Sequence, residues 1–199
     1  MCKKNTQKVA LYVFREGVQD TDLLIIDSVK RYLKMSDSDG RTVTVKRSDR
    51  GAPSIAEAGM PYVSVSHSGG YTVCAVSDGG VGIDLQKTDS LKRENEEEYT
   101  DRLLRLAKRF FHPHDAGWIR VSPKHRFYTV WSAKEAYVKY TGSGIDDDFP
   151  HFRVIPDEGP SGSAWECDGM FYEALPFEEG FSLCICTPEI AEAEIEYEL

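Results

Sequence analysis

Three charged residues, Lys134, Glu135 and Lys139, fall close together in a segment whose pattern predicts a helix. At helical period the apolar residues of this segment gather largely on one side, while the three charged residues project from neighbouring turns. Glu135 and Lys139 could form an i,i+4 ion pair on a solvated helix face, which is the interpretation that spacing alone favours.

A second group of polar residues lies in the stretch from Ser64 to Lys87. Ser66 and His67 are adjacent, which invites a hydrolase interpretation, but neighbouring strand residues point in opposite directions and the chain has no G-x-S-x-G elbow. A lone histidine is most often a buried structural residue, whereas the SHSGG context favours contact with a ligand. Asp84, taken alone, could be a surface aspartate beside a turn.

The two stretches together carry three short motifs in a fixed order. Val65–Ser68 reads VSHS, Gly82–Lys87 reads GIDLQK, and Trp131–Lys139 reads WSAKEAYVK. In this order they resemble the 4'-phosphopantetheinyl transferases, specifically the larger surfactin-synthetase-activating (Sfp) type. The resemblance is clear from about Pro61 to Phe152.

The resemblance implies an α+β fold, a pseudo-dimer of two similar α/β lobes with the active site in the cleft between them. A change from strands to a charged, helix-rich stretch fits a boundary between lobes at 1–87 and 88–199. The implied reaction is Mg²⁺-dependent transfer of the 4'-phosphopantetheine arm of coenzyme A to a serine of an apo acyl or peptidyl carrier protein. The alternative is a degenerate member that binds coenzyme A or a carrier protein without catalysis.

The resemblance also assigns site residues. Asp84, Gln86 and Glu135 match the positions that hold Mg²⁺, a cation that prefers hard oxygen ligands. Lys134 and Lys139 match contacts to the coenzyme A pyrophosphate, where negative charge grows on the leaving group. Glu135 is the expected base, and Glu135 and Lys139 are the expected catalytic residues.

Ser66 and His67 match residues that hold the 3'-phosphate of coenzyme A. Three departures from the family pattern weaken the expected contacts. Gln86 stands where the surfactin type often has a third acid, so it supplies an oxygen without a negative charge. Ala52 stands where a basic phosphate contact is common, and Asp27 lies near the place of an arginine.

Composition narrows the partners. The net charge of −9 argues against nucleic acid as the main partner. The segment from Arg102 to Arg126 nevertheless holds seven basic residues against one acid, so it is a plausible docking surface for an acidic carrier protein. The pseudo-dimer implied by the resemblance predicts a monomer. We also expect a protein that does not bind membranes and that stays in the cytoplasm, because no apolar run is long enough to span a bilayer or to serve as a signal peptide.

The five cysteines are scattered without a C-x-x-C spacing, which argues against both a disulfide framework and a structural zinc site. They are expected to be reduced packing residues, with Cys184 and Cys186 on opposite faces of a strand.

The elements that must position these residues can be outlined. Helical patterns cover 22–33, with Thr21 or Asp22 as the cap, and also the leucine-rich stretch before Pro113, the short stretch 115–119 and the motif segment. Strands are expected at 8–14, 41–46, 62–66, 71–77, 81–85, 151–155, 164–174, 180–186 and 191–199. Asp78, Gly79 and Gly80 predict a hairpin between 71–77 and 81–85.

Overall fold

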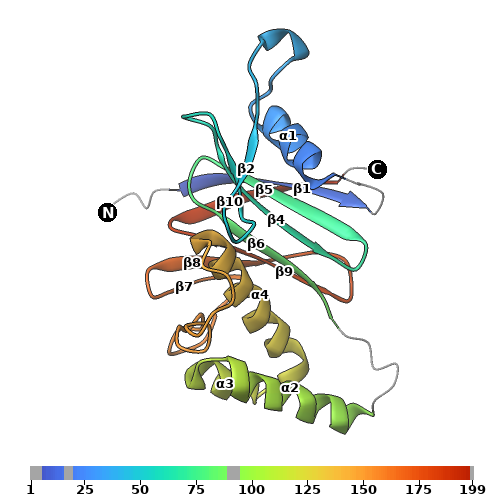
Figure 1. Ribbon diagram of the computed structural model, residues 1–199. Coiled ribbons are helices and arrows are strands. Elements are labelled where there is room, and N and C mark those ends of the chain that lie inside the picture. Colours follow the sequence, from blue (N-terminus) through green and yellow to red (C-terminus); the bar gives the residue numbers. More distant parts are fainter. Residues whose placement is uncertain (1–5, 16–19, 89–94, 198–199) are drawn as a thin grey trace.

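The computed structural model describes residues 6–15, 20–88 and 95–197. One four-stranded sheet has the order β10-β1-β5-β4, with β1 (Thr6–Arg15), β4 (Tyr62–Ser68), β5 (Tyr71–Ser77) and β10 (Ile190–Tyr197). β4 and β5 form an antiparallel hairpin, β1 pairs antiparallel with β5, and β10 adds to β1 in parallel. The last strand of the chain therefore completes a sheet built by the first part of the chain (Figure 1).

The second four-stranded sheet has the order β6-β9-β8-β7 and is antiparallel throughout. Its strands are β6 (Gly82–Lys87), β7 (Ala164–Cys167), β8 (Met170–Leu175) and β9 (Phe181–Thr187). A short β2 (Val45–Arg47) pairs with β3 (Pro53–Ile55) as a separate two-stranded ribbon. The helices are α1 (Thr21–Tyr32), α2 (Glu96–Phe110), α3 (Pro113–Ile119) and α4 (Pro123–Thr141), with a 3₁₀ turn η1 at Asp37–Asp39.

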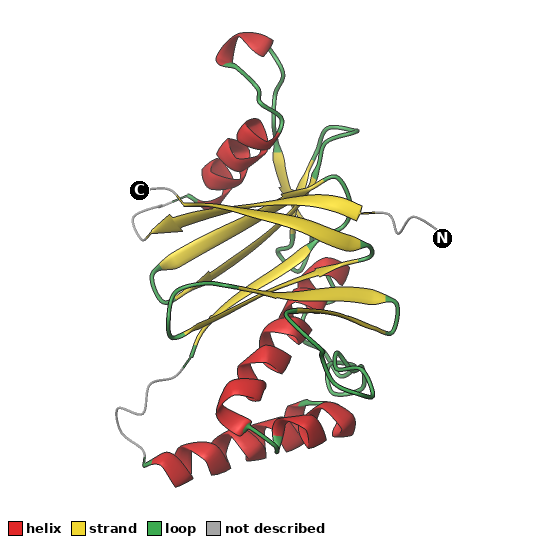
Figure 2. Cartoon of the chain, turned by 180° about the vertical axis from the view of Figure 1, so that it is seen from behind, coloured by secondary structure: helices red, strands yellow, loops and turns green. Residues whose placement is uncertain are grey.

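The two four-stranded sheets stack face to face, with helices on their outer faces (Figure 2). Strand alternation decides what each face buries. Leu11 and Val13 of β1 pack with Ile83 of β6 and Ile185 of β9 in the apolar layer between the sheets. Tyr12 lies on the other face of β1 and packs beneath α1. A third apolar cluster joins β7, β8 and β9 to α2, α3 and α4.

Four layers result from this packing: α1, the sheet that contains β1, the sheet that contains β6, and the group of α2, α3 and α4 (Figure 1). This arrangement confirms the mixed α/β class. The division into two lobes at 87/88 stays a prediction, and β10 pairs across that boundary with β1.

Several local predictions need correction. The segment 78–80 does not close a hairpin, because β5 pairs with β1 and β4 while β6 pairs with β9 in the other sheet. The cap of α1 is Asp20, whose side chain accepts hydrogen bonds from the amides of Asp22 and Leu23, so Thr21 and Asp22 are not the cap. Residues 151–155 form no strand, and only the end of the predicted strand 41–46 lies in a ladder, as part of β2.

The cysteine prediction also needs correction. Cys184 and Cys186 are both buried in the cluster beneath α4, because residues two apart on a strand share a face. Cys74, Cys167, Cys184 and Cys186 are free thiols, as expected. Burial raises the pKa of the Cys74 thiol to about 12, which fits a packing role. Cys2 lies outside the described residues.

Candidate active site

Asp84 lies in the middle of β6 and is 5% exposed. Its Oδ1 accepts hydrogen bonds from the Ser66 hydroxyl at 3.1 Å and from the Lys139 ammonium at 2.9 Å. Among the described residues, its Oδ2 is buried and has no hydrogen-bond partner. Since buried carboxylate oxygens are nearly always paired, this atom is where a ligand of the protein is expected.

A glycine lets α4 approach Asp84. A Cβ placed on Gly82 would lie 1.9 Å from the carbonyl oxygen of Ala136 and 2.6 Å from the amide nitrogen of Tyr140. Only a residue without a side chain fits between the β6 backbone and the α4 backbone at this point. The glycine of the GIDLQK motif therefore fixes how closely Asp84 sits to the charged side chains of α4.

Glu135 and Lys139 face this part of β6 from one side of α4. Lys139 reaches both Asp84 and the Ser66 hydroxyl, the latter at 2.8 Å. Burial raises the pKa of the Glu135 carboxyl, the negative charge of Asp84 raises it further, and Lys139 opposes both effects. The structure thus brings Asp84, Glu135 and Lys139 together, and Lys139 pairs with Asp84 across the two elements.

Gln86 follows Asp84 on the same face of β6 and is half-buried. Its amide nitrogen donates to the carbonyl oxygen of Lys87 at 2.8 Å. This bond uses the donor end of the amide, and the acceptor end is the one that could bind a cation.

Ser66 is buried beside Asp84 rather than in an open pocket. Its oxygen accepts from the Leu85 amide at 3.0 Å and from Lys139, and it donates to Asp84. These contacts place Ser66 with the carboxylate, apart from its sequence neighbour His67.

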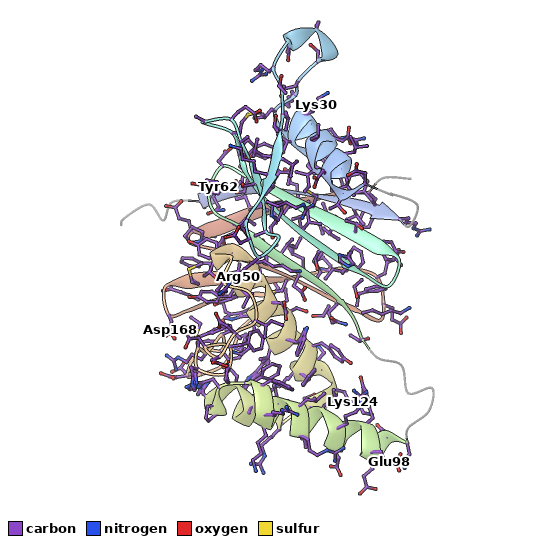
Figure 3. The ribbon with its side chains drawn as sticks, in the orientation of Figure 1. Lys30, Arg50, Tyr62, Glu98, Lys124 and Asp168 are labelled. Atoms are coloured by element: carbon purple, nitrogen blue, oxygen red, sulfur yellow. The ribbon has the colours of Figure 1, made fainter. Side chains whose placement is uncertain are left out.

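His67 is exposed and lines a cavity of about 310 Å³ between β4, the β2–β3 ribbon and the end of α4. Arg47, Arg50 and Lys139 line the same cavity. Arg47 is held by Asp22, with its Nε 3.1 Å from Oδ1 of that residue. Arg50 lies near the C-terminal end of α4, and its side chain is labelled in Figure 3. The cavity is therefore a basic pocket that opens beside Lys139.

Lys134 is not part of this group. It is fully buried, and its Nζ donates to the carbonyl oxygens of Phe149 at 2.9 Å and Phe152 at 2.5 Å. The ammonium also lies 3.7 Å from the centre of the Phe152 ring. Burial lowers the pKa of Lys134 to about 8, opposed by the negative charge of Asp115. This buried position argues against the predicted contact between Lys134 and the coenzyme A pyrophosphate.

Asp115 is the second charged residue in this core. It is fully buried, and its carboxylate accepts from the amides of Val154 at 3.1 Å and Ile155 at 3.2 Å. Lys134 and Asp115 together hold the segment 149–155 against α3 and α4. Sequence reasoning missed this pair, since its partners are backbone groups of a segment with no regular structure.

The basic segment Arg102–Arg126 lies on α2, α3 and the start of α4, far from Arg50 (Figure 3). Not all of its charges are available, because Lys124 pairs with Glu96 and Arg126 donates to the Trp118 carbonyl oxygen. A hollow of about 780 Å³ runs between α2 and α3. Its lining includes the basic residues Arg105, Lys108 and Arg120 and the apolar residues Leu104 and Phe111.

The donor set beside α4 fits a hard divalent cation. Mg²⁺ is commonly held by one or two carboxylates together with substrate phosphates and water. Asp84 Oδ2, the Glu135 carboxylate and the Gln86 amide oxygen are donors of this kind. Within the described part of the chain, no group of three or more histidine, cysteine, aspartate or glutamate side chains could hold a metal ion. The fit therefore rests on two carboxylates, as expected when Gln86 replaces an acid.

Comparison with known proteins identifies the class of this protein. A model of the 4'-phosphopantetheinyl transferase superfamily matches residues 80–186, which include β6 and α4. The chain belongs to this superfamily, and membership places it in a class of transferase enzymes, as the motifs predict.

Three relatives illustrate the similarity. The chain is 28% identical to 4'-phosphopantetheinyl transferase Sfp of Bacillus subtilis over 176 residues, covering 83% of this chain and 70% of Sfp. It is 27% identical to another 4'-phosphopantetheinyl transferase of Bacillus subtilis, covering 66% of this chain and 61% of the relative. It is 37% identical to 4'-phosphopantetheinyl transferase HetI of Nostoc sp. over 95 residues, or 45% of this chain and 36% of HetI.

Proposed function

We propose that this chain transfers the 4'-phosphopantetheine arm of coenzyme A to a serine of an apo acyl or peptidyl carrier protein and releases 3',5'-ADP. One observation carries the proposal. The buried Oδ2 of Asp84 has no hydrogen-bond partner among the described residues, and the half-buried Glu135 lies beside this carboxylate. Family membership supports the reaction class, and this oxygen supports a site for the chemistry beside Asp84.

Asp84, Glu135 and Gln86 would hold the Mg²⁺ ion, which when bound neutralises charge on the substrate pyrophosphate. The ammonium of Lys139 lies 2.9 Å from the Asp84 carboxylate and compensates its charge. It would stabilise the negative charge that grows on the departing 3',5'-ADP.

The transfer step exchanges one bond for another. The serine oxygen of the carrier forms a bond to the phosphorus that bears pantetheine, while the bond from that phosphorus to the bridging oxygen of the pyrophosphate breaks. The electron pair of the broken bond leaves on 3',5'-ADP. The serine proton would pass to the Glu135 carboxylate, directly or through a water.

The basic pocket would take the nucleotide end of coenzyme A. His67, Arg47 and Arg50 surround it, and Lys139 connects it to the reacting centre. Arginine is well suited to phosphate because its planar fork donates two parallel hydrogen bonds. Arg50 in particular would supply the cation that is missing at Ala52.

The hollow between α2 and α3 would receive the carrier protein. Its lining holds three basic residues against one acid, Asp101, together with apolar residues, and this mixture suits an acidic helical partner, since charge steers the encounter and apolar contacts stabilise the complex. A two-lobed monomer that works in the cytoplasm remains part of the proposal. No helix in the described residues is long and apolar enough to cross a membrane.

The proposal is tested by incubating the protein with coenzyme A, Mg²⁺ and a panel of apo carriers from fatty acid, polyketide and nonribosomal peptide synthesis. Mass spectrometry of the carrier should show addition of the phosphopantetheine arm, and omission of Mg²⁺ should abolish it. A protein that binds coenzyme A but modifies no carrier in the panel would instead support the non-catalytic alternative.

A further inference from the structure

Three serines of β4 form a ladder to β6, although these strands belong to different sheets. The Ser64 hydroxyl accepts from the Ile83 amide at 3.1 Å, and the Ser68 hydroxyl accepts from the Lys87 amide at 2.8 Å. Ser66 makes the middle rung by accepting from the amide that follows Asp84. The serine hydroxyls of β4 therefore accept hydrogen bonds from backbone N–H groups along one edge of β6. In the described residues, no strand of its own sheet pairs with this edge.

Only the middle rung touches the active-site charges. A serine hydroxyl has one donor and two acceptor positions. The Ser66 oxygen accepts from Leu85 and from Lys139, and its proton is directed at Asp84 Oδ1, with a longer 3.4 Å alternative at the Leu85 carbonyl oxygen. These bonds use the full capacity of the hydroxyl, so none is left for a phosphate.

We propose that Ser66 is a positioning residue, which orients Asp84 and Lys139, and that its hydroxyl does not contact the 3'-phosphate of coenzyme A. This inference rests on the proposed function. By bonding Oδ1 of Asp84, Ser66 and Lys139 leave Oδ2 as the oxygen available to a cation. The hydrogen bond from the backbone amide of Leu85 holds the Ser66 hydroxyl in place.

Ser66→Ala tests the proposal, with Ser68→Ala as the matched control. Both variants remove one hydroxyl that accepts from a β6 amide, but only Ser66→Ala removes contacts to Asp84 and Lys139. We expect Ser66→Ala to lower kcat about 10-fold or more, with little change in KM for coenzyme A and the same loss with dephospho-coenzyme A. Ser68→Ala should retain its turnover.

A change confined to KM for coenzyme A, and absent with dephospho-coenzyme A, would overturn the proposal and make Ser66 a phosphate contact. So would equal kinetics for the two variants.

Two measurements do not depend on transfer. Calorimetric titration with Mn²⁺ should show weaker binding by Ser66→Ala than by Ser68→Ala. Unfolding measurements should show that Ser66→Ala and Asp84→Asn are not additive, whereas Ser68→Ala and Asp84→Asn are additive. Additivity in both pairs would refute the positioning role. Lack of transfer by the unmodified chain, with this coupling present, would instead contradict only the proposed function.

Discussion

Lys134 and Lys139 stand five residues apart on α4, and the helix turns them toward different surroundings. Lys139 bonds Asp84 and Ser66 beside the basic pocket, whereas Lys134 bonds two backbone carbonyl oxygens in the core. Residues of one motif therefore lie in two surroundings, one beside the proposed reacting centre and one in the core. Comparing matched substitutions at the two lysines separates the effects of these surroundings.

The largest expected effect is on stability at Lys134. Lys134→Gln shortens the side chain and leaves the buried carbonyl oxygens of Phe149 and Phe152 without their donor, so the free energy of unfolding should fall by about 3–5 kcal/mol. Chemical denaturation measures this loss. A change below about 1 kcal/mol would show that the core does not depend on these hydrogen bonds.

The pH dependence offers a check on the same residue. The folded pKa of Lys134 is about 8, below the ordinary value of 10.5. Between these values the unfolded chain binds more protons than the folded chain, so this group makes stability rise with pH. Relative to Lys134→Gln, the unmodified protein should therefore gain stability from pH 8 to 10.5. A constant difference between the two proteins would contradict the lowered pKa.

The matched change at Lys139 should act on turnover instead. Lys139→Gln keeps a donor near Asp84 but removes the charge assigned to the leaving group, so kcat should fall by an amount equivalent to about 2–4 kcal/mol. Its loss of stability should be smaller than that of Lys134→Gln. Equal turnover in the two variants would contradict the proposal that Lys139, and not Lys134, acts on the leaving group.

The sequence predicted much of this arrangement. The motifs placed Asp84, Glu135 and Lys139 in one site, and periodicity located most helices and strands. The burial of Lys134 in the core and the contacts of the Ser66 hydroxyl were not predicted, because they depend on which neighbours each side chain meets after folding. The hairpin at 78–80 was misassigned since a turn motif does not reveal that the next strand joins a different sheet.

A smaller effect is expected in the basic pocket. Arg50→Ala and His67→Ala should raise KM for coenzyme A by roughly 10-fold each, with little change in kcat, because their contacts are remote from the breaking bond. Dephospho-coenzyme A should reduce the difference for whichever residue binds the 3'-phosphate. A loss confined to kcat would place that residue at the reacting centre.

The smallest effect is expected at the hollow between α2 and α3. Arg105→Glu should raise KM for the carrier several-fold at low salt, with KM for coenzyme A unchanged. Arg109→Glu makes the same charge change outside the residues that line the hollow, so it should have a weaker effect. Equal effects would indicate general charge attraction rather than docking in the hollow.

The central claim is that Asp84 and Glu135 act together at one face of α4. Single-turnover transfer by Glu135→Ala, followed by mass spectrometry of the carrier, tests it most directly. We expect the variant to remain folded and to transfer at least about 100-fold more slowly than the unmodified chain. A folded Glu135→Ala protein with near-normal turnover would contradict the account.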